Sequence, residues 1–196
     1  MLRPLEESSL KLILHWRNTP AVRQAMFTQH EISWEEHKAW FRRAQADDTN
    51  RWFLYLNKNN QPSGVVYFKN IDAAHQSAYW GFYASPDATP GTGLRMSLDA
   101  LDKAFNELAL EKLNADVLVS NSKSLKMHKN VGFAEEGLFR EHFFDGEQRV
   151  DVIRFGILAH EWPVCRKALK MRITELDALA AQRESAPHPN YHYRDS

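Results

Sequence analysis

The apolar positions of this 196-residue chain follow two periods, one typical of strands and one typical of helices. Short apolar runs bounded by turn residues indicate buried strands. We expect such strands at residues 1–5, 51–56, 64–71, 76–84, 112–120, 138–144 and 149–158. Seven strands with helices between them predict an α/β fold with one mixed, mostly antiparallel sheet flanked by helices.

Helices are predicted where apolar residues recur every three or four positions. A capping-box pattern of Ser33 and Glu36 opens one of them, and Asn121, a favoured N-cap residue, opens another. Gly132 is placed to end that second helix in the left-handed conformation. The expected helices cover residues 8–17, the segment from Ser33, residues 94–108 and the segment from Asn121 to Gly132.

The chain changes character beyond residue 162. Residues 163–186 carry apolar positions such as Leu169 and Ile173 at helical spacing, which predicts an added amphipathic helix. The tail 187–196 is predicted to be disordered. We therefore expect one domain over 1–162, with a helix that either packs back on it or forms a homodimer contact.

Composition and charge exclude several classes of protein. The 25 basic and 25 acidic residues balance, so nothing indicates a nucleic-acid partner. Cys165 is the only cysteine, which excludes an internal disulfide and a cysteine-based zinc site. The histidines lack ligand partners at metal-binding spacing, so no metal is expected. No signal peptide and no apolar stretch near ~20 residues are present, which predicts a cytoplasmic protein without a membrane partner.

Two landmarks about thirty residues apart carry the candidate chemistry. Gly91 and Gly93 lie between a predicted strand and the helix that follows it. Glycines there let the backbone approach a ligand, and the free N–H groups of a first helical turn bind anions such as a pyrophosphate. On its own this turn is also typical of an ordinary strand-to-helix connection. The second landmark runs from Asn121 through His128 to Gly132.

The order of strand, Gly-rich turn, helix, strand, Asn, helix and Gly-Phe resembles the two acetyl-CoA-binding motifs of the GNAT superfamily of N-acetyltransferases. The resemblance covers residues 1–162 and implies acetyl-CoA as co-substrate. One departure is Ala88, where the family usually carries Gln or Arg, so the backbone amides and Arg95 are left to hold the diphosphate. The implied cofactor-binding residues are Phe82, Tyr83, Ala84, Gly91, Thr92, Gly93, Leu94, Arg95, Asn121, Ser124 and Lys126.

The same resemblance implies two catalytic residues. His128 stands where the family usually carries a Tyr as general acid, and as an imidazolium it would protonate the departing thiolate with an apparent pKa of roughly 6 to 7.5. The alternative is a surface His hydrogen-bonded to a nearby strand. Asp116 lies among apolar strand residues and is the best candidate base, the alternative being an ion pair with a neighbouring cation. Free backbone N–H groups at 79–84, where that strand splays from the next one, would serve the oxyanion.

Patterns near the N-terminus limit the choice of substrate class. They are Trp16-Arg17-Asn18, Val22-Arg23, Ile32-Ser33 and Trp40-Phe41. They resemble the nucleotide-sugar N-acetyltransferases of pseudaminic acid biosynthesis (PseH). This implies UDP-4-amino-4,6-dideoxy-N-acetyl-β-L-altrosamine as acceptor, a precursor of the sugar that decorates flagellin. The implied substrate-side residues, which would supply cations, stacking rings and an apolar contact, are Arg17, Met26, Phe27, His37 and Tyr83.

The back half of the chain leaves alternatives open. Gly132-Phe133, Glu136-Gly137 and Arg140 also look like the Rim-type protein N-terminal acetyltransferases and the spermidine acetyltransferases. A polyamine site would need a cluster of carboxylates, and the front helices show no such excess beyond Glu35 and Glu36. Three hypotheses therefore stand: an amino-sugar N-acetyltransferase, a Rim-type enzyme, and a non-catalytic acyl-CoA-binding GNAT domain.

Overall fold

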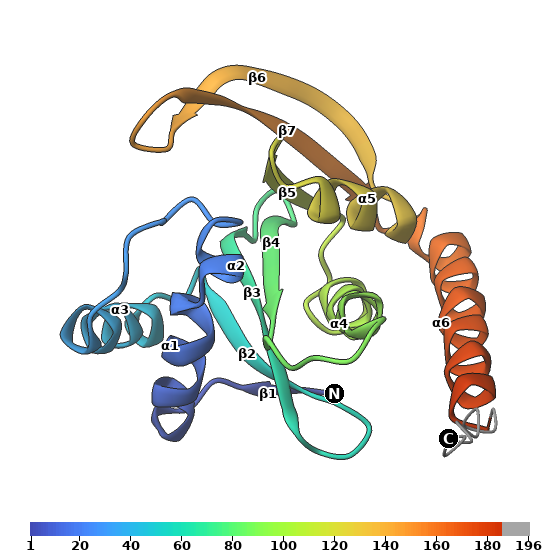
Figure 1. Ribbon diagram of the computed structural model, residues 1–196. Helices are drawn as coiled ribbons and strands as arrows, with labels where there is room; N and C mark the ends of the chain where they lie inside the picture. The colour runs from blue at the N-terminus through green and yellow to red at the C-terminus, as the bar shows by residue number, and fades with distance from the viewer. Residues whose placement is uncertain (186–196) are drawn as a thin grey trace, which may run out of the picture.

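A computed structural model describes residues 1–185, which form one mixed sheet with helices on both faces (Figure 1). Within these residues the sheet has seven strands in the order β1-β2-β3-β4-β5-β7-β6. Only β4 and β5 run parallel, and the other neighbours are antiparallel. The predicted mixed α/β sheet is confirmed. The predicted disordered tail, 187–196, lies outside the described residues.

The strand bounds follow the apolar pattern closely where a strand has a buried face. Strands β2 and β7 have the predicted bounds, whereas β6 begins at Ala134 rather than at 138. Strand β6 is a largely exposed edge strand, so its first residues are held by backbone pairing with β7 and show no apolar alternation. The strands are β1 (Leu2–Pro4), β2 (Arg51–Leu56), β3 (Pro62–Asp72), β4 (Ser77–Ala84), β5 (Lys112–Leu118), β6 (Ala134–Phe144) and β7 (Arg149–Leu158).

The predicted helices are all present, together with one short helix that the pattern did not predict. That helix, α2 (Pro20–Arg23), is too short to show a period, and it begins with a proline at its first turn. The others are η1 (Glu7–Ser9), α1 (Leu10–Asn18), α3 (Trp34–Ala46), α4 (Thr92–Asp102), the π-helical turn η2 (Lys103–Glu107), α5 (Ser122–Val131) and α6 (Trp162–Ser185).

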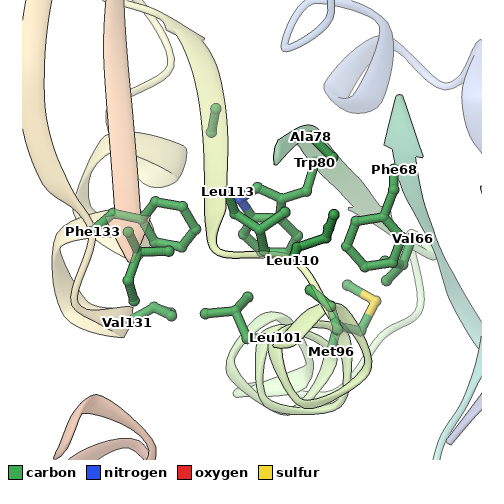
Figure 2. Close-up of a cluster of buried hydrophobic side chains, with 14 of the residues drawn as sticks. Val66, Phe68, Ala78, Trp80, Met96, Leu101, Leu110, Leu113, Val131 and Phe133 are labelled. Carbon is green, nitrogen blue, oxygen red and sulfur yellow. The ribbon is translucent and has the colours of Figure 1, made fainter. Parts of the chain in front are cut away.

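Two apolar clusters lie on opposite faces of the sheet because neighbouring residues of a strand point to opposite sides. Val66 belongs to the cluster beneath α4, which also contains Trp80, Met96 and Leu101 (Figure 2). Val65, one position earlier, belongs to the cluster on the side of α1 and α3. The Gly-rich turn at the start of α4 and the front helices are thereby placed on different faces (Figure 1).

The two parallel strands separate after a short ladder. Residues Ser77, Ala78 and Tyr79 of β4 pair with Lys112, Leu113 and Asn114 of β5, and the ladder ends there. Beyond this point β4 stays paired with β3, and β5 stays paired with β7. The predicted splay of the strand at 79–84 is confirmed, and the edge of β4 beyond Tyr79 is left open toward β5.

Helix α6 packs on the domain against α4 and α5. Leu169 is fully buried in the cluster beneath α4, and the indole Nε1 of Trp162 donates to Asp102 at 2.9 Å. Gly132 ends α5 with φ +111, and a Cβ there would lie 2.4 Å from the Sγ of Cys165 on α6. Gly132 therefore serves both the predicted left-handed cap and this close approach. No helix among the described residues is long and apolar enough to cross a membrane.

Candidate active site

The turn that begins α4 has the geometry of an anion-binding site. Gly91 is the N-cap residue and adopts φ +82, which favours glycine. The Thr92 amide and hydroxyl both donate to the Thr89 carbonyl, at 3.1 and 2.7 Å, so this side chain is turned inward and closes the turn. A Cβ on Gly93 would have its nearest neighbour at 3.7 Å, in Phe82. The turn thus presents amides at the positive end of a helix, which fits a diphosphate.

Arg95, predicted to hold the diphosphate, already has two partners. Its Nη1 donates to the carbonyl of Pro90 at 3.2 Å, and its Nη2 lies 2.5 Å from Oδ1 of Asp177 on α6. The guanidinium therefore ties the Gly-rich turn to α6. Leu94, the neighbouring predicted residue, packs with the cluster beneath α4.

The N-terminus of α5 has the predicted cap. The Oδ1 of Asn121 accepts a hydrogen bond from the Ser124 amide at 3.1 Å, and its Nδ2 donates to the carbonyl of Ala25 at 3.4 Å. Asn121 thereby joins α5 to the loop of residues 24–33, which connects α2 to α3. Lys126, another predicted cofactor residue, is exposed on α5.

His128 is enclosed by aromatic rings. Only 3% of it is exposed, and its ring centroid lies 5.1 to 5.5 Å from those of Trp80, Phe133 and Phe155. Nδ1 lies 2.9 Å from the carbonyl of Ser124. A carbonyl can only accept, so Nδ1 carries the proton and Nε2 does not. Nε2 is buried and has no hydrogen-bond partner among the described residues.

This environment corrects the predicted state of His128. Burial lowers its pKa from 6.5 to about 4, and the hydrogen bond to Ser124 opposes that only in part. The ring is therefore neutral near neutral pH in this structure, which differs from the expected imidazolium with an apparent pKa of 6 to 7.5, and the catalytic role of His128 stays a prediction. The alternative of a surface histidine is wrong. The sequence could not predict this burial, because Trp80 and Phe155, which enclose the ring, come from strands that are distant in the chain.

Asp116 forms the ion pair that was the alternative to a catalytic base. Arg154 lies directly opposite it on β7 and donates from Nε to Oδ1 and from Nη2 to Oδ2, the latter at 3.1 Å. The Arg154 guanidinium lies over the rings of Tyr79 and Phe139, at 4.8 and 4.9 Å. A base at this position would have to release two charge-assisted hydrogen bonds before taking up a proton.

The five predicted substrate-side residues line one pocket. This pocket of about 310 Å³, called the acceptor pocket below after the role predicted for these five residues, lies on the α1 and α3 side of the sheet, beside the loop 24–33. The structure thus brings together residues that are up to sixty-six positions apart in the chain. The pocket is lined by Arg17, Met26, Phe27, His37 and Tyr83, and also by Thr28, Ile32, Glu36, Trp40, Arg43, Trp52, Tyr67 and Lys69.

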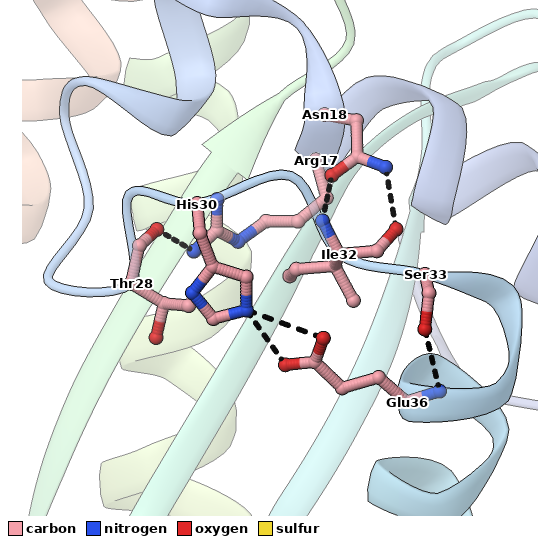
Figure 3. A network of polar contacts seen from close by, with 7 residues as sticks. All are labelled: Arg17, Asn18, Thr28, His30, Ile32, Ser33 and Glu36. Atoms are coloured by element: carbon pink, nitrogen blue, oxygen red, sulfur yellow. Dashed lines mark hydrogen bonds and ion pairs between the residues drawn. The ribbon is translucent and has the colours of Figure 1, made fainter.

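Arg17 is a buried cation that has no carboxylate partner within the part of the chain that the structure describes. It is 8% exposed, and its Nη2 donates to the carbonyl of Thr28 at 2.7 Å (Figure 3). Its Nη1 is buried and has no partner among the described residues. Burial lowers its pKa, although the guanidinium remains charged. A buried charge that lacks a partner is costly, and an anionic ligand in the pocket would relieve that cost.

His37, which we expected with Arg17 to supply positive charge, has a ring whose pKa is lowered instead. It stacks on Trp40 with centroids 4.9 Å apart, and its Nε2 is buried without a partner among the described residues. Burial lowers its pKa, and the positive charge of Arg17 lowers it further. The further cations of the pocket are Lys69 and Arg43.

Lys69 and its ring neighbours are pocket residues that the sequence reading missed. The Lys69 ammonium lies 5.4 and 5.2 Å from the ring centroids of Trp52 and Tyr67. Desolvation and Arg17 lower its pKa. One signal was available: Tyr67 and Lys69 alternate with Val65 along β3, so they share its face.

Glu36 is the one carboxylate among the residues that line the acceptor pocket, and it is already engaged. Its oxygens lie 2.9 and 3.2 Å from Nε2 of His30 (Figure 3). The predicted capping box is therefore half formed, because Ser33 accepts from the Glu36 amide while the Glu36 carboxylate turns to His30. Asn18 and Ile32 exchange two hydrogen bonds, of 2.8 and 2.9 Å, and fix the loop to the end of α1.

The family of the chain follows from this architecture and from comparison with known proteins. Residues 1–134 match the acetyltransferase (GNAT) domain. The chain belongs to the GNAT acetyltransferase family. It is therefore an N-acetyltransferase of the GNAT fold, and the open edge of β4 with the Gly-rich turn of α4 fits acetyl-CoA as co-substrate.

Two groups of relatives resemble this GNAT chain. Acetyltransferase PseH from Campylobacter jejuni is 35% identical over 129 residues, which are 66% of this chain and 79% of that protein. Spermidine N(1)-acetyltransferase from Vibrio cholerae is 29% identical over 163 residues, which are 82% of this chain and 94% of that protein. A crystal structure of spermidine N-acetyltransferase from V. cholerae with CoA and spermine superposes with a TM-score of 0.77 at 28% identity, covering 83% of this chain and 96% of that one.

Proposed function

We propose that this GNAT enzyme acetylates the 4-amino group of a UDP-linked 4-amino-4,6-dideoxy sugar, as in pseudaminic acid biosynthesis for flagellin glycosylation. The specific acceptor proposed is UDP-4-amino-4,6-dideoxy-N-acetyl-β-L-altrosamine. The observation that carries the proposal is the charge of the acceptor pocket. Arg17, Arg43 and Lys69 line it, and its single carboxylate is bound to His30.

The cations match a diphosphate. Arg17 offers an unpartnered Nη1 within a buried site, where a charge-assisted hydrogen bond to an anion is strong. Lys69 is a second basic side chain on the pocket wall, and burial together with the positive charge of Arg17 lowers its pKa. His37, neutral beside them, offers Nε2 as a hydrogen-bonding atom without adding charge.

The uncharged lining matches the rest of such a substrate. Trp40 and Trp52 are in edge-to-face contact at 4.7 Å and provide ring surface on which a nucleobase can stack. Met26 and Phe27 provide apolar contact for a 6-methyl group. Phe27 is 44% exposed and touches Phe143 of β6 edge-to-face at 5.3 Å, so it closes the pocket toward the β6–β7 hairpin.

A polyamine acceptor is the main competing hypothesis. The likeness to spermidine acetyltransferases covers more of this chain than the likeness to PseH does. Polyamines are polycations, however, and Arg17 with Lys69 would repel them from a pocket whose carboxylate is occupied. A Rim-type acceptor, the amino group at the N-terminus of a protein, brings no phosphate for the free Nη1 of Arg17 to bind. Pocket charge therefore favours the nucleotide sugar.

The chemistry of the reaction also fits a neutral His128. Acetyl-CoA supplies the activated acetyl group, the amine nitrogen forms the new bond to the carbonyl carbon, and the bond to sulfur breaks. The nitrogen must lose a proton and the sulfur must gain one, so the amine itself supplies the proton that the thiolate needs. Free N–H groups on the open edge of β4 would stabilise the oxyanion. The unprotonated Nε2 of His128 can accept a hydrogen bond. Catalytic roles for His128 and Asp116 stay predictions.

The test compares acceptors on the wild-type enzyme. Free thiol release from acetyl-CoA is measured with the UDP-4-amino-4,6-dideoxy sugar, with spermidine, and with peptides that begin with Ser or Ala. We expect kcat/KM for the nucleotide sugar to exceed that for the other acceptors by at least a hundredfold, about 2.7 kcal/mol. A preference for spermidine or for the peptides would overturn the proposal. Absence of thiol release with every acceptor would favour the non-catalytic alternative.

A further inference from the structure

Helix α6 reaches the Gly-rich turn from outside the region matched by the family. The family match ends at residue 134, and α6 begins at Trp162. The helix is attached to both ends of α4. At the C-terminal end of α4, Arg166 donates to Asp102 at 2.6 and 2.8 Å. At its N-terminal end, Asp177 pairs with Arg95.

The Asp177 contact acts on the turn through Arg95. One nitrogen of the Arg95 guanidinium binds Asp177, while the other binds the Pro90 carbonyl at 3.2 Å. This carbonyl belongs to the peptide that leads into Gly91, the residue with φ +82. A planar guanidinium held at two points is fixed in orientation, which an ammonium group would not be.

An apolar contact supports the same position. A Cβ on Gly91 would lie 2.7 Å from Nη1 of Arg95 and 3.3 Å from Cδ1 of Leu176. Leu176 and Asp177 are adjacent on α6, so the helix covers the outer side of the turn with one apolar and one charged side chain. The segment from Pro90 to Gly93 is thereby enclosed between Arg95, α6 and the first turn of α4.

We infer that Asp177 is a positioning residue for acetyl-CoA: through Arg95 it holds the Pro90-Gly91 turn in the conformation that presents its amides to the diphosphate. This rests on the acetyl-CoA half of the proposed function and is independent of the acceptor. A preformed turn loses less conformational entropy on binding, so the affinity for the anion is higher. The added helix is on this account part of the cofactor site.

The first test removes the charge of Asp177 and keeps its size. For Asp177→Asn we expect the Kd of acetyl-CoA, measured by calorimetry, to rise about three- to tenfold, because the partly exposed pair couples modestly to the turn. The matched control is Glu175→Gln, an exposed carboxylate two positions away on the same helix, which should leave the Kd unchanged. Thermal unfolding of both variants shows whether α6 still packs.

Two further measurements separate this role from a general loss of structure. In an Arg95→Gln background, Asp177→Asn should add nothing, because the effect passes through Arg95. With S-acetylpantetheine, which lacks the diphosphate, kcat/KM should be the same in wild type and Asp177→Asn. An unchanged Kd in Asp177→Asn, or a lowered one because the carboxylate repels the diphosphate, would overturn the inference. Equal losses with acetyl-CoA and S-acetylpantetheine would do the same. None of these outcomes depends on which acceptor is used, so failure here is distinct from failure of the acceptor assignment.

Discussion

The charged side chains on the two faces of the sheet differ in whether they form ion pairs. On the α4 face, Arg95 is bound to Asp177 and Asp102 is bound to Arg166. On the α1 and α3 face, Arg17 is buried with one nitrogen unpartnered among the described residues. Charges on the α4 face fix one helix to another, while the charge on the other face remains available to a ligand. This difference, rather than the size of the pocket, is what supports the proposal that the acceptor binds on the α1 and α3 face.

Two histidines sharpen the comparison, because burial lowers the pKa of both and neither has a partner at Nε2 among the described residues. His37 lies on the wall of an open pocket beside Arg17, so a ligand can reach it. His128 lies among Trp80, Phe133 and Phe155. Burial disfavours the charged form of both rings. His37 nevertheless faces a pocket, whereas His128 is enclosed by aromatic side chains.

The largest expected effect is on stability and comes from His128. Its folded-state pKa, about 4, lies below the unfolded value of 6.5, so protonation favours unfolding. The contribution is complete above pH 6.5 and is lost as the pH falls toward 4, by up to about 3 kcal/mol. We expect the free energy of unfolding, from urea titrations, to fall over this range in wild type and to fall less in His128→Phe. Equal slopes in both proteins would contradict the neutral, buried state.

The pH dependence of kcat tests whether His128 also has a catalytic role. A neutral His128 predicts that any alkaline limb of kcat near pH 6 to 7.5 belongs to another group, and that it stays in place in His128→Phe. Pre-steady-state thiol release across pH keeps product release from masking the chemistry. If the limb disappears in His128→Phe, the imidazolium of His128 is the general acid after all, and binding of acetyl-CoA raises its pKa.

The next largest effect tests the proposed role of Arg17 on the α1 and α3 face. Arg17→Gln removes the buried cation, so the KM for the UDP-sugar should rise about 30- to 100-fold while the KM for acetyl-CoA stays the same. Arg42→Gln, on the exposed side of α3, is the control and should change neither constant. Equal increases in both KM values would mean that Arg17 supports the fold rather than the acceptor.

The smallest of these effects tests the turn on the α4 face. Gly93→Glu places bulk and negative charge beside the diphosphate, so acetyl-CoA should bind at least tenfold more weakly, about 1.4 kcal/mol. Gly93→Ala is the matched control, because a Cβ there meets nothing closer than 3.7 Å. Calorimetry gives both affinities. A folded Gly93→Glu protein with wild-type affinity would remove the turn from the cofactor site.

Local pattern was enough to predict most of the fold. The bounds of β2 and β7 and the caps at Asn121 and Gly132 agree with the sequence reading. These features depend on residues close in the chain or on strand periodicity. The misses, α2 and the start of β6, are a helix too short to repeat and an edge strand without a buried face.

The sequence by itself determined which residue types are present at the two sites: a Gly-rich turn, an Asn-capped helix, and Arg17, Met26, Phe27 and His37 near the front. The tertiary structure decided their chemical states. It paired Asp116 with Arg154, joined Arg95 to Asp177 eighty-two positions away, and left Nη1 of Arg17 without a partner among residues 1–185. The physical reason is that hydrogen bonding, ion pairing and desolvation depend on neighbours in space, and these neighbours come from segments that are distant in the chain.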